Sequence, residues 1–99
     1  MPGIKWLPEA LADVSRLHEF VKAQHPEAAT RVAQAILDGA DLLSRSPDLG
    51  RPMDDGTGRR EVFLSFGAGA YVLRYINDTD RTSVIIRVWH SREDRTSHE

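Results

Sequence analysis

The chain has 99 residues, a formal net charge of -2 and no cysteine, and 40% of its residues are hydrophobic and 28% charged. This length fits a single domain, and the composition is that of an ordinary globular protein rather than a disordered one. The lack of cysteine excludes disulfides and thiolate metal sites, and the low net charge argues against broad electrostatic attraction to nucleic acid or anionic lipid.

The N-terminal half predicts one short strand and two helices. Residues 4–7 are partly apolar and precede Pro8, which suits the first turn of a helix because an N–H there has no intrahelical partner. Apolar residues then recur at helical spacing and predict a buried stripe. The predicted stripe comprises Ala10, Leu11, Val14, Leu17, His18 and Val21, and the predicted polar face comprises Glu9, Asp13, Arg16 and Glu19. A second helix is expected to start at Pro26 and to end before Pro47, and the short connection predicts an antiparallel hairpin.

The C-terminal half predicts a run of strands. Residues 48–58 are rich in Pro, Gly and Asp and lack periodicity, which indicates a surface loop. Extended composition returns in three stretches separated by short turn clusters, which predicts an antiparallel meander. These stretches are residues 60–66, 71–76 and 83–89. Strict alternation in the last stretch places Val84, Ile86 and Val88 on one face and Ile85, Arg87 and Trp89 on the other.

Together these elements predict an α+β fold. We expect an N-terminal strand at the sheet edge and an antiparallel two-helix hairpin packed on one face of a three- to four-stranded antiparallel sheet. Because no linker or repeat divides the chain, residues 1–99 are expected to form one domain, with a polar tail at about residues 93–99 that frays unless something holds it. No apolar run has the length of a secretory leader or a membrane span, so we expect a cytoplasmic protein with no membrane partner.

The candidate chemistry lies on the predicted strands. The four histidines form no ligand motif and the glycine pairs lead into strands rather than helices, so we predict no metal and no cofactor. The remaining polar set comprises Glu61, Arg74, Arg87, His90 and Arg92. The side chains of Arg74 and Arg87 are expected to lie outside the core, on the sheet face away from the helices. A glutamate, an arginine and a histidine are the groups that ribonucleolytic attack by a 2'-hydroxyl needs. Cross-strand ion pairing at an ordinary sheet rim explains the same residues without any chemistry.

Several segments give the chain a family resemblance. They are Ser46 to Pro52, Gly58 to Glu61, Tyr71 to Tyr75 and Ile86 to Asp94. With the order strand, helix hairpin and meander, the chain resembles toxins of the ParE/RelE superfamily from bacterial type II toxin-antitoxin pairs. The closing pattern of His90, Arg92 and Asp94, with a single residue between each pair of neighbours, is most similar to the ParE branch.

The resemblance implies a growth-inhibiting toxin that forms a hetero-oligomer with a cognate antitoxin, whose disordered C-terminal segment folds on the toxin. ParE toxins are known as inhibitors of DNA gyrase, whereas RelE toxins cut messenger RNA on the ribosome. The low net charge and the position of Arg74 directly before Tyr75 favour the gyrase hypothesis, in which the chain has no catalytic residue. That hypothesis predicts target contacts at Trp89, His90, Arg92 and the tail after Asp94. It predicts antitoxin contacts at Arg60, Arg74 and Arg87.

Two alternatives stay open at this point. The first is a ribosome-dependent messenger RNA endonuclease that uses Glu61, Arg74 and His90. The second is a decayed toxin that survives only as a binding module.

Overall fold

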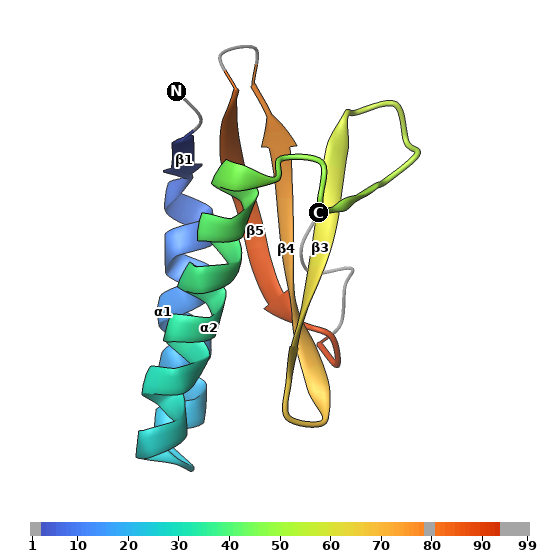
Figure 1. Ribbon diagram of the computed structural model, residues 1–99. Coiled ribbons are helices and arrows are strands. Elements are labelled where there is room, and N and C mark those ends of the chain that lie inside the picture. The colour runs from blue at the N-terminus through green and yellow to red at the C-terminus, as the bar shows by residue number, and fades with distance from the viewer. Residues whose placement is uncertain (1–2, 79–80, 94–99) are drawn as a thin grey trace.

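The computed structural model describes residues 3–78 and 81–93, and these form two helices and a sheet (Figure 1). The elements in chain order are β1 (Gly3–Trp6), α1 (Pro8–Lys22), α2 (Pro26–Arg45), β2 (Arg51–Pro52), β3 (Arg59–Phe66), β4 (Gly69–Asn77) and β5 (Thr82–His90). The predicted α+β class, the helix hairpin and the run of three strands are confirmed. The predicted frayed tail lies outside the described residues, apart from Glu93.

Local chemistry accounts for where the helices begin and end. Each helix has a proline in its first turn, Pro8 in α1 and Pro26 in α2, so no hydrogen bond is lost to the missing N–H. Each helix also has a glutamate in its first turn and a basic residue in its last, which complements the helix dipole. No helix in the described part of the chain combines the length and the apolar character needed to cross a membrane.

The sheet has five strands in the order β1-β5-β4-β3-β2. Strands β3, β4 and β5 form the predicted antiparallel meander, and β1 adds to the edge as expected. However, β1 pairs with β5 in parallel, so the prediction of a purely antiparallel sheet is wrong. The helix hairpin separates β1 from the meander, and no tight turn therefore fixes its direction.

The second correction to the sheet is the short strand β2, which lies where a loop was expected. Arg51 pairs with Glu61, and Pro52 pairs with Arg60. A proline is tolerated there because β2 is the outermost strand and its outer side needs no ladder hydrogen bond.

Both helices cover the same face of the sheet, and the core lies between these two layers (Figure 1). The largest fully buried side chains of this core cluster are Tyr75, Ile36, Leu43, Leu73 and Ile85. Gly39 of α2 lies against Leu64 of β3 so closely that a Cβ at this glycine would collide with the leucine side chain. The glycine therefore lets α2 pack directly onto β3.

A β-bulge in β5 changes which side chains face the helices. Tyr75 of β4 pairs with Ile85, but Arg74 pairs with Arg87, which leaves Ile86 as an extra residue. Ile85 and Val88 consequently both join the core under the helices. The strict alternation predicted for this strand is wrong, because one extra residue moves every later side chain to the opposite face.

Candidate functional site

A buried polar cluster lies on the sheet face away from the helices. Glu61 Oε2 accepts hydrogen bonds from Arg74 Nε at 3.1 Å and Nη2 at 2.9 Å. The guanidinium carbon of Arg74 lies 4.9 Å from the ring centroid of Trp89, within the range of a cation–π interaction. Arg74 is 7% exposed and Trp89 is 0% exposed. The expectation that this arginine and this indole ring are available on the surface is therefore wrong, because the two side chains pack against each other and against Glu61.

The guanidinium group of Arg87 is also held by another part of the chain. Its Nε and Nη2 atoms donate to the two carboxylate oxygens of Asp13 in α1, at 2.7 and 3.0 Å. Asp13 also accepts a hydrogen bond of 2.9 Å from the backbone N–H of Val88. Arg87 lies opposite Arg74 in the register of the sheet, and its guanidinium group reaches Asp13 at the edge of β5, beyond the residues that pair with β1.

Two residues of α1 lie on another face than predicted. Leu11 was expected in the buried stripe but is 53% exposed. The second is Asp13. It was expected on the polar face of α1, yet it is only 4% exposed. A signal was present in its spacing, since it follows Ala10 by three residues and precedes Leu17 by four, and both neighbours are buried. Its charge alone led to the polar-face assignment.

The environment of Asp13 favours its charged form. Burial by itself raises the pKa of this carboxyl group. The hydrogen bonds from Arg87 and Val88 and the charges of Arg87 and Arg16 outweigh burial, and they hold the pKa below its ordinary value. Asp13 therefore joins α1 to β5 as a carboxylate.

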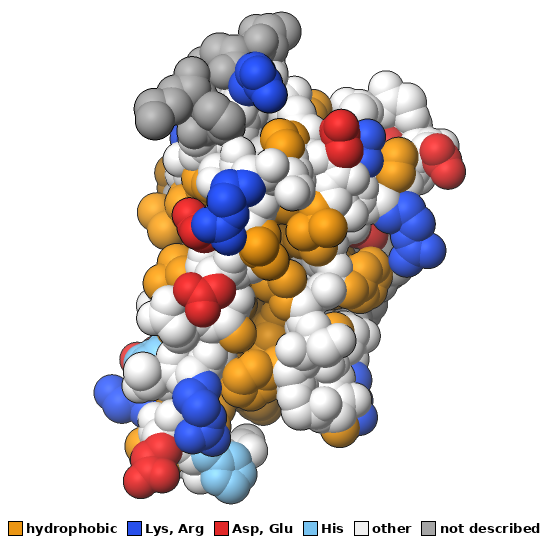
Figure 2. Space-filling view, in the orientation of Figure 1, with side chains coloured by type: hydrophobic (Ala, Val, Ile, Leu, Met, Phe, Trp, Pro, Cys, Tyr) orange, Lys and Arg blue, Asp and Glu red, His pale blue; other side chains and the backbone are white. Residues whose placement is uncertain are grey.

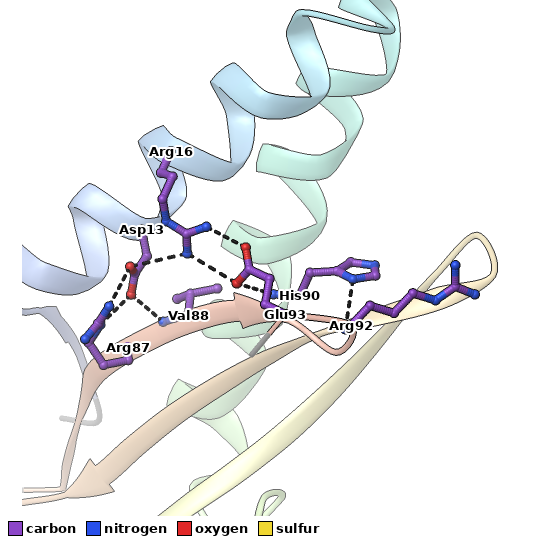
Figure 3. Close-up of polar contacts among 7 residues, drawn as sticks. All are labelled: Asp13, Arg16, Arg87, Val88, His90, Arg92 and Glu93. Atoms are coloured by element: carbon purple, nitrogen blue, oxygen red, sulfur yellow. Dashed lines mark hydrogen bonds and ion pairs between the residues drawn. The ribbon is translucent and has the colours of Figure 1, made fainter. Parts of the chain in front are cut away.

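The turn after β5 is tied to α1 by a second ion pair (Figure 3). Arg16 Nη1 lies 2.5 Å from Glu93 Oε1, and its Nη2 lies 3.5 Å from Asp13 Oδ1. Glu93 Oε2 in turn accepts a hydrogen bond of 3.3 Å from the backbone N–H of His90. A continuous series of ion pairs thus connects the bulge of β5, through α1, to the turn at residues 90–93.

His90 lies on the helix side of the sheet. Its ring meets Tyr71 edge to face, with centroids 5.1 Å apart, and its Nδ1 accepts a hydrogen bond of 3.2 Å from the backbone N–H of Arg92. Tyr71 belongs to the core beneath the helices, whereas Glu61 and Arg74 lie on the opposite face. The structure therefore brings Glu61 and Arg74 together but does not bring His90 to them.

Arg60 holds a loop rather than projecting from the sheet. Its Nη1 donates to the carbonyl oxygen of Gly50 at 2.6 Å, and its Nη2 lies 3.5 Å from an oxygen of Asp48. The hydroxyl of Tyr75 also binds this loop, because it donates to Pro47 O and accepts from Gly50 N, both at 2.8 Å. The Ser46 to Pro52 segment that supports the family resemblance thus has a structural role in this chain.

A pocket opens beside the Arg16–Glu93 pair, between α1 and the end of β5. Its volume is about 620 Å³, and it is lined by Arg16, Leu17, Phe20, Val21, Tyr71, His90, Arg92 and Glu93. His90 and Arg92, which were predicted as target contacts, meet in this pocket, and Trp89 does not line it. We call it the α1/β5 pocket.

A second hollow of about 520 Å³ runs between α2 and β3 and includes Leu42, Gly39 and Phe63. Figure 2 shows hydrophobic side chains gathered along this α2/β3 groove between the helices and the sheet. Asp38, Asp41 and Arg45 also line it, and Arg45 pairs with Asp41. Among residues 3–78 and 81–93, no group of three or more His, Cys, Asp or Glu side chains is arranged to hold a metal ion.

Comparison with known families and sequences gives matches to a ParE family model and to two toxins named RelE. Residues 4–95 match the model of the ParE toxin of type II toxin-antitoxin systems, parDE. The chain is 37% identical over 95 residues to Toxin RelE3 of Caulobacter vibrioides, a match that covers 96% of this chain and 100% of that protein. It is 33% identical over 86 residues to Toxin RelE1 of the same organism, covering 87% of this chain and 89% of that toxin.

A solved structure of the chromosomal ParDE TA system from P. aeruginosa has a similar fold. Its TM-score with this chain is 0.73 at 22% sequence identity, and the match covers 91% of this chain and 96% of that one. At this level of identity the likeness supports the arrangement of helices and strands, and it carries no residue roles.

Proposed function

The chain belongs to the ParE toxin family of type II toxin-antitoxin systems, and from that premise we propose that it arrests growth by binding DNA gyrase, with no catalytic turnover of its own. Membership of this family implies a cognate antitoxin as partner. We place its action in the cytoplasm, where gyrase works.

The observation that carries this proposal is the separation of the candidate catalytic residues. Arg74 is held by Glu61 and stacked on Trp89 on one face of the sheet, and His90 packs on Tyr71 on the other. A general acid or base must come within hydrogen-bonding distance of the group it serves, and these three side chains do not surround a common space. The net charge of -2 also disfavours tight binding of RNA phosphates.

The proposed target contacts are His90 and Arg92, which line the α1/β5 pocket. Trp89 is excluded as a direct contact in this conformation because it is fully buried. The predicted contact after Asp94 lies outside the described residues. For the antitoxin, the partly exposed guanidinium groups of Arg60 and Arg87 stay proposed contacts, whereas Arg74 is enclosed by the protein's own side chains.

A supercoiling assay tests the proposal directly. Purified chain is added to gyrase and relaxed plasmid, with and without the antitoxin. We expect the chain to block the introduction of negative supercoils and the antitoxin to restore it. Unchanged supercoiling at micromolar concentrations of a chain that arrests growth would remove gyrase as the target.

The second candidate function is messenger RNA cleavage on the ribosome, favoured by the RelE names of the two curated relatives. This function requires a rearrangement that brings the Arg74 and His90 side chains to the same RNA. Either Arg74 separates from Glu61 and Trp89, or His90 separates from Tyr71. New RNA ends that appear on translating ribosomes with the wild-type chain and disappear with His90→Ala would establish this function in place of gyrase binding.

A further inference from the structure

The α1/β5 pocket carries an inference that rests on the proposed function and makes it more specific. We infer that this pocket is where the target protein docks, and that it receives one projecting apolar side chain flanked by a carboxylate. The argument depends on the walls of the pocket, its charge and its rigidity.

The walls of the pocket are apolar and the rim carries an exposed aromatic ring. Leu17 and Tyr71 are buried at 3% and 5% exposure and belong to the core, so they form a fixed surface. Phe20 on the neighbouring turn of α1 is 65% exposed, the highest value among the exposed large hydrophobic residues of the described chain. A volume of about 620 Å³ leaves room for one or two large side chains. A partner that covers Phe20 and fills this pocket removes apolar surface from water.

More arginines than carboxylates line the pocket. Among the charged side chains that line the pocket, Arg16 pairs with Glu93 and Arg92 is a second guanidinium group, so two guanidinium groups accompany one carboxylate. Arg92 is the group left over, because it is exposed and its guanidinium makes a hydrogen bond of 3.5 Å to the carbonyl of Ala68. An acidic residue next to the apolar side chain of the partner complements this charge.

The same ion pairs keep the pocket in one shape. Arg16 is bound to Glu93, and Glu93 accepts a hydrogen bond from the His90 backbone, so the turn that forms one wall is fastened to the helix that forms the other (Figure 3). A site that is already ordered loses little conformational entropy when a partner binds. The pocket therefore suits a side chain that projects from a folded surface.

The α2/β3 groove suits a different kind of partner. It is lined by Asp38, Asp41 and Arg45, with Arg45 paired to Asp41 at 3.2 Å, and it runs along β3, where pairing with β2 reaches no further than Glu61 among the described residues. An uncovered strand edge beside an apolar groove fits an extended segment that adds as a strand. Since a folded enzyme presents side chains rather than a free strand, we assign the target to the α1/β5 pocket.

Growth arrest after expression of the full chain without antitoxin tests this inference independently of the identity of the target. Phe20→Glu places a charge at the rim and is expected to weaken growth arrest at least about ten-fold, the loss typical of a central contact. The matched control is Phe63→Glu in the α2/β3 groove, which changes another exposed phenylalanine ring, 47% against 65% for Phe20, and is expected to keep growth arrest. Thermal melting of both purified variants verifies that they fold.

Charge recognition is tested at Arg92, which is exposed and not part of the core. Arg92→Glu is expected to weaken growth arrest at least about ten-fold, and Arg92→Lys to keep most of it, since lysine preserves the charge. Growth arrest by folded Phe20→Glu and Arg92→Glu at the wild-type level would overturn the inference. So would loss of antitoxin binding by Phe20→Glu in a pull-down, because the pocket would then belong to the antitoxin. If the wild-type chain arrests growth without affecting supercoiling, gyrase fails as the target while these variants still decide the role of the pocket.

Discussion

Asp13 does more than balance a charge, because its one carboxylate joins the first helix to the bulged last strand. It takes two hydrogen bonds from Arg87 and one from the Val88 backbone at a position that is 4% exposed. Among the described residues, strand β1 pairs with residues 82–85 of β5, and beyond Ile85 a side chain of α1 binds the outer edge of the strand. The carboxylate thus satisfies a backbone donor that β1 does not reach.

The first prediction concerns the pH dependence that this carboxylate produces. Because the pKa of Asp13 is lower in the folded chain than in the unfolded one, the carboxylate stabilises the fold above the ordinary aspartate pKa of about 3.9. This stabilisation is lost as the pH falls below that value toward the folded pKa. Asp13→Asn is expected to lower the free energy of unfolding by about 2 to 3 kcal/mol at pH 7. The difference between wild type and variant, measured by urea denaturation, should shrink below pH 4. A difference that stays constant from pH 7 to pH 3 would contradict the account.

The second prediction concerns the hydroxyl of Tyr75, a residue that is 0% exposed. Tyr75→Phe removes the bridge between Pro47 O and Gly50 N and leaves the Gly50 N–H without its partner. We expect a loss of about 1 to 3 kcal/mol in the free energy of unfolding, the typical cost of an unsatisfied buried donor. Equal stability of wild type and variant in urea would show that the loop does not depend on this hydroxyl.

At the scale of elements, the loop between α2 and β2 has one tightly packed point, at Gly50. A Cβ at Gly50 would lie 2.6 Å from Tyr75 Cε1 and 3.0 Å from the carbonyl oxygen of Glu61, and neither group has room to move. The loop therefore depends on a glycine for close approach rather than for an unusual backbone conformation.

The third prediction follows from that contact. Gly50→Ala is expected to destabilise the fold by about 1 to 3 kcal/mol because it overpacks the site. Since Gly50 and Tyr75 share the contact, Gly50→Ala combined with Tyr75→Phe should cost less than the sum of the two single changes. The four free energies of unfolding form a double-mutant cycle, and strict additivity would refute the shared contact.

The features that could be predicted from the sequence have local causes, and the features that could not be predicted have long-range causes. The helices begin at Pro8 and Pro26 and the strands follow their turn clusters, because these boundaries depend on neighbouring residues. The bulge at Ile86 and the parallel pairing of β1 depend on contacts across the fold, and no local pattern encodes them. Among the candidate site residues, His90 and Arg92 line one pocket, and their contact with a target stays a prediction. Trp89 was misjudged because periodicity gives the face of a strand but not what else packs there.

At the scale of the whole molecule, two hollows in the described part of the chain differ in their charged residues. The α1/β5 pocket is lined by two arginines and one carboxylate, Arg16, Arg92 and Glu93, and the α2/β3 groove is lined by two carboxylates and one arginine, Asp38, Asp41 and Arg45. A net charge of -2 therefore conceals a local difference in the balance of charge between these two sites. A toxin that must bind both a target and an antitoxin can use such a difference to keep its partners apart.

The central claim is that this toxin acts by occupying gyrase rather than by turning over a substrate, and the stoichiometry of inhibition tests it most directly. The chain is titrated into supercoiling reactions at two gyrase concentrations, both above the dissociation constant of the complex. The account predicts that the amount of chain needed for half inhibition rises in proportion to gyrase. Full inhibition by chain far below the gyrase concentration would contradict it, and so would growth arrest with supercoiling intact and new messenger RNA ends.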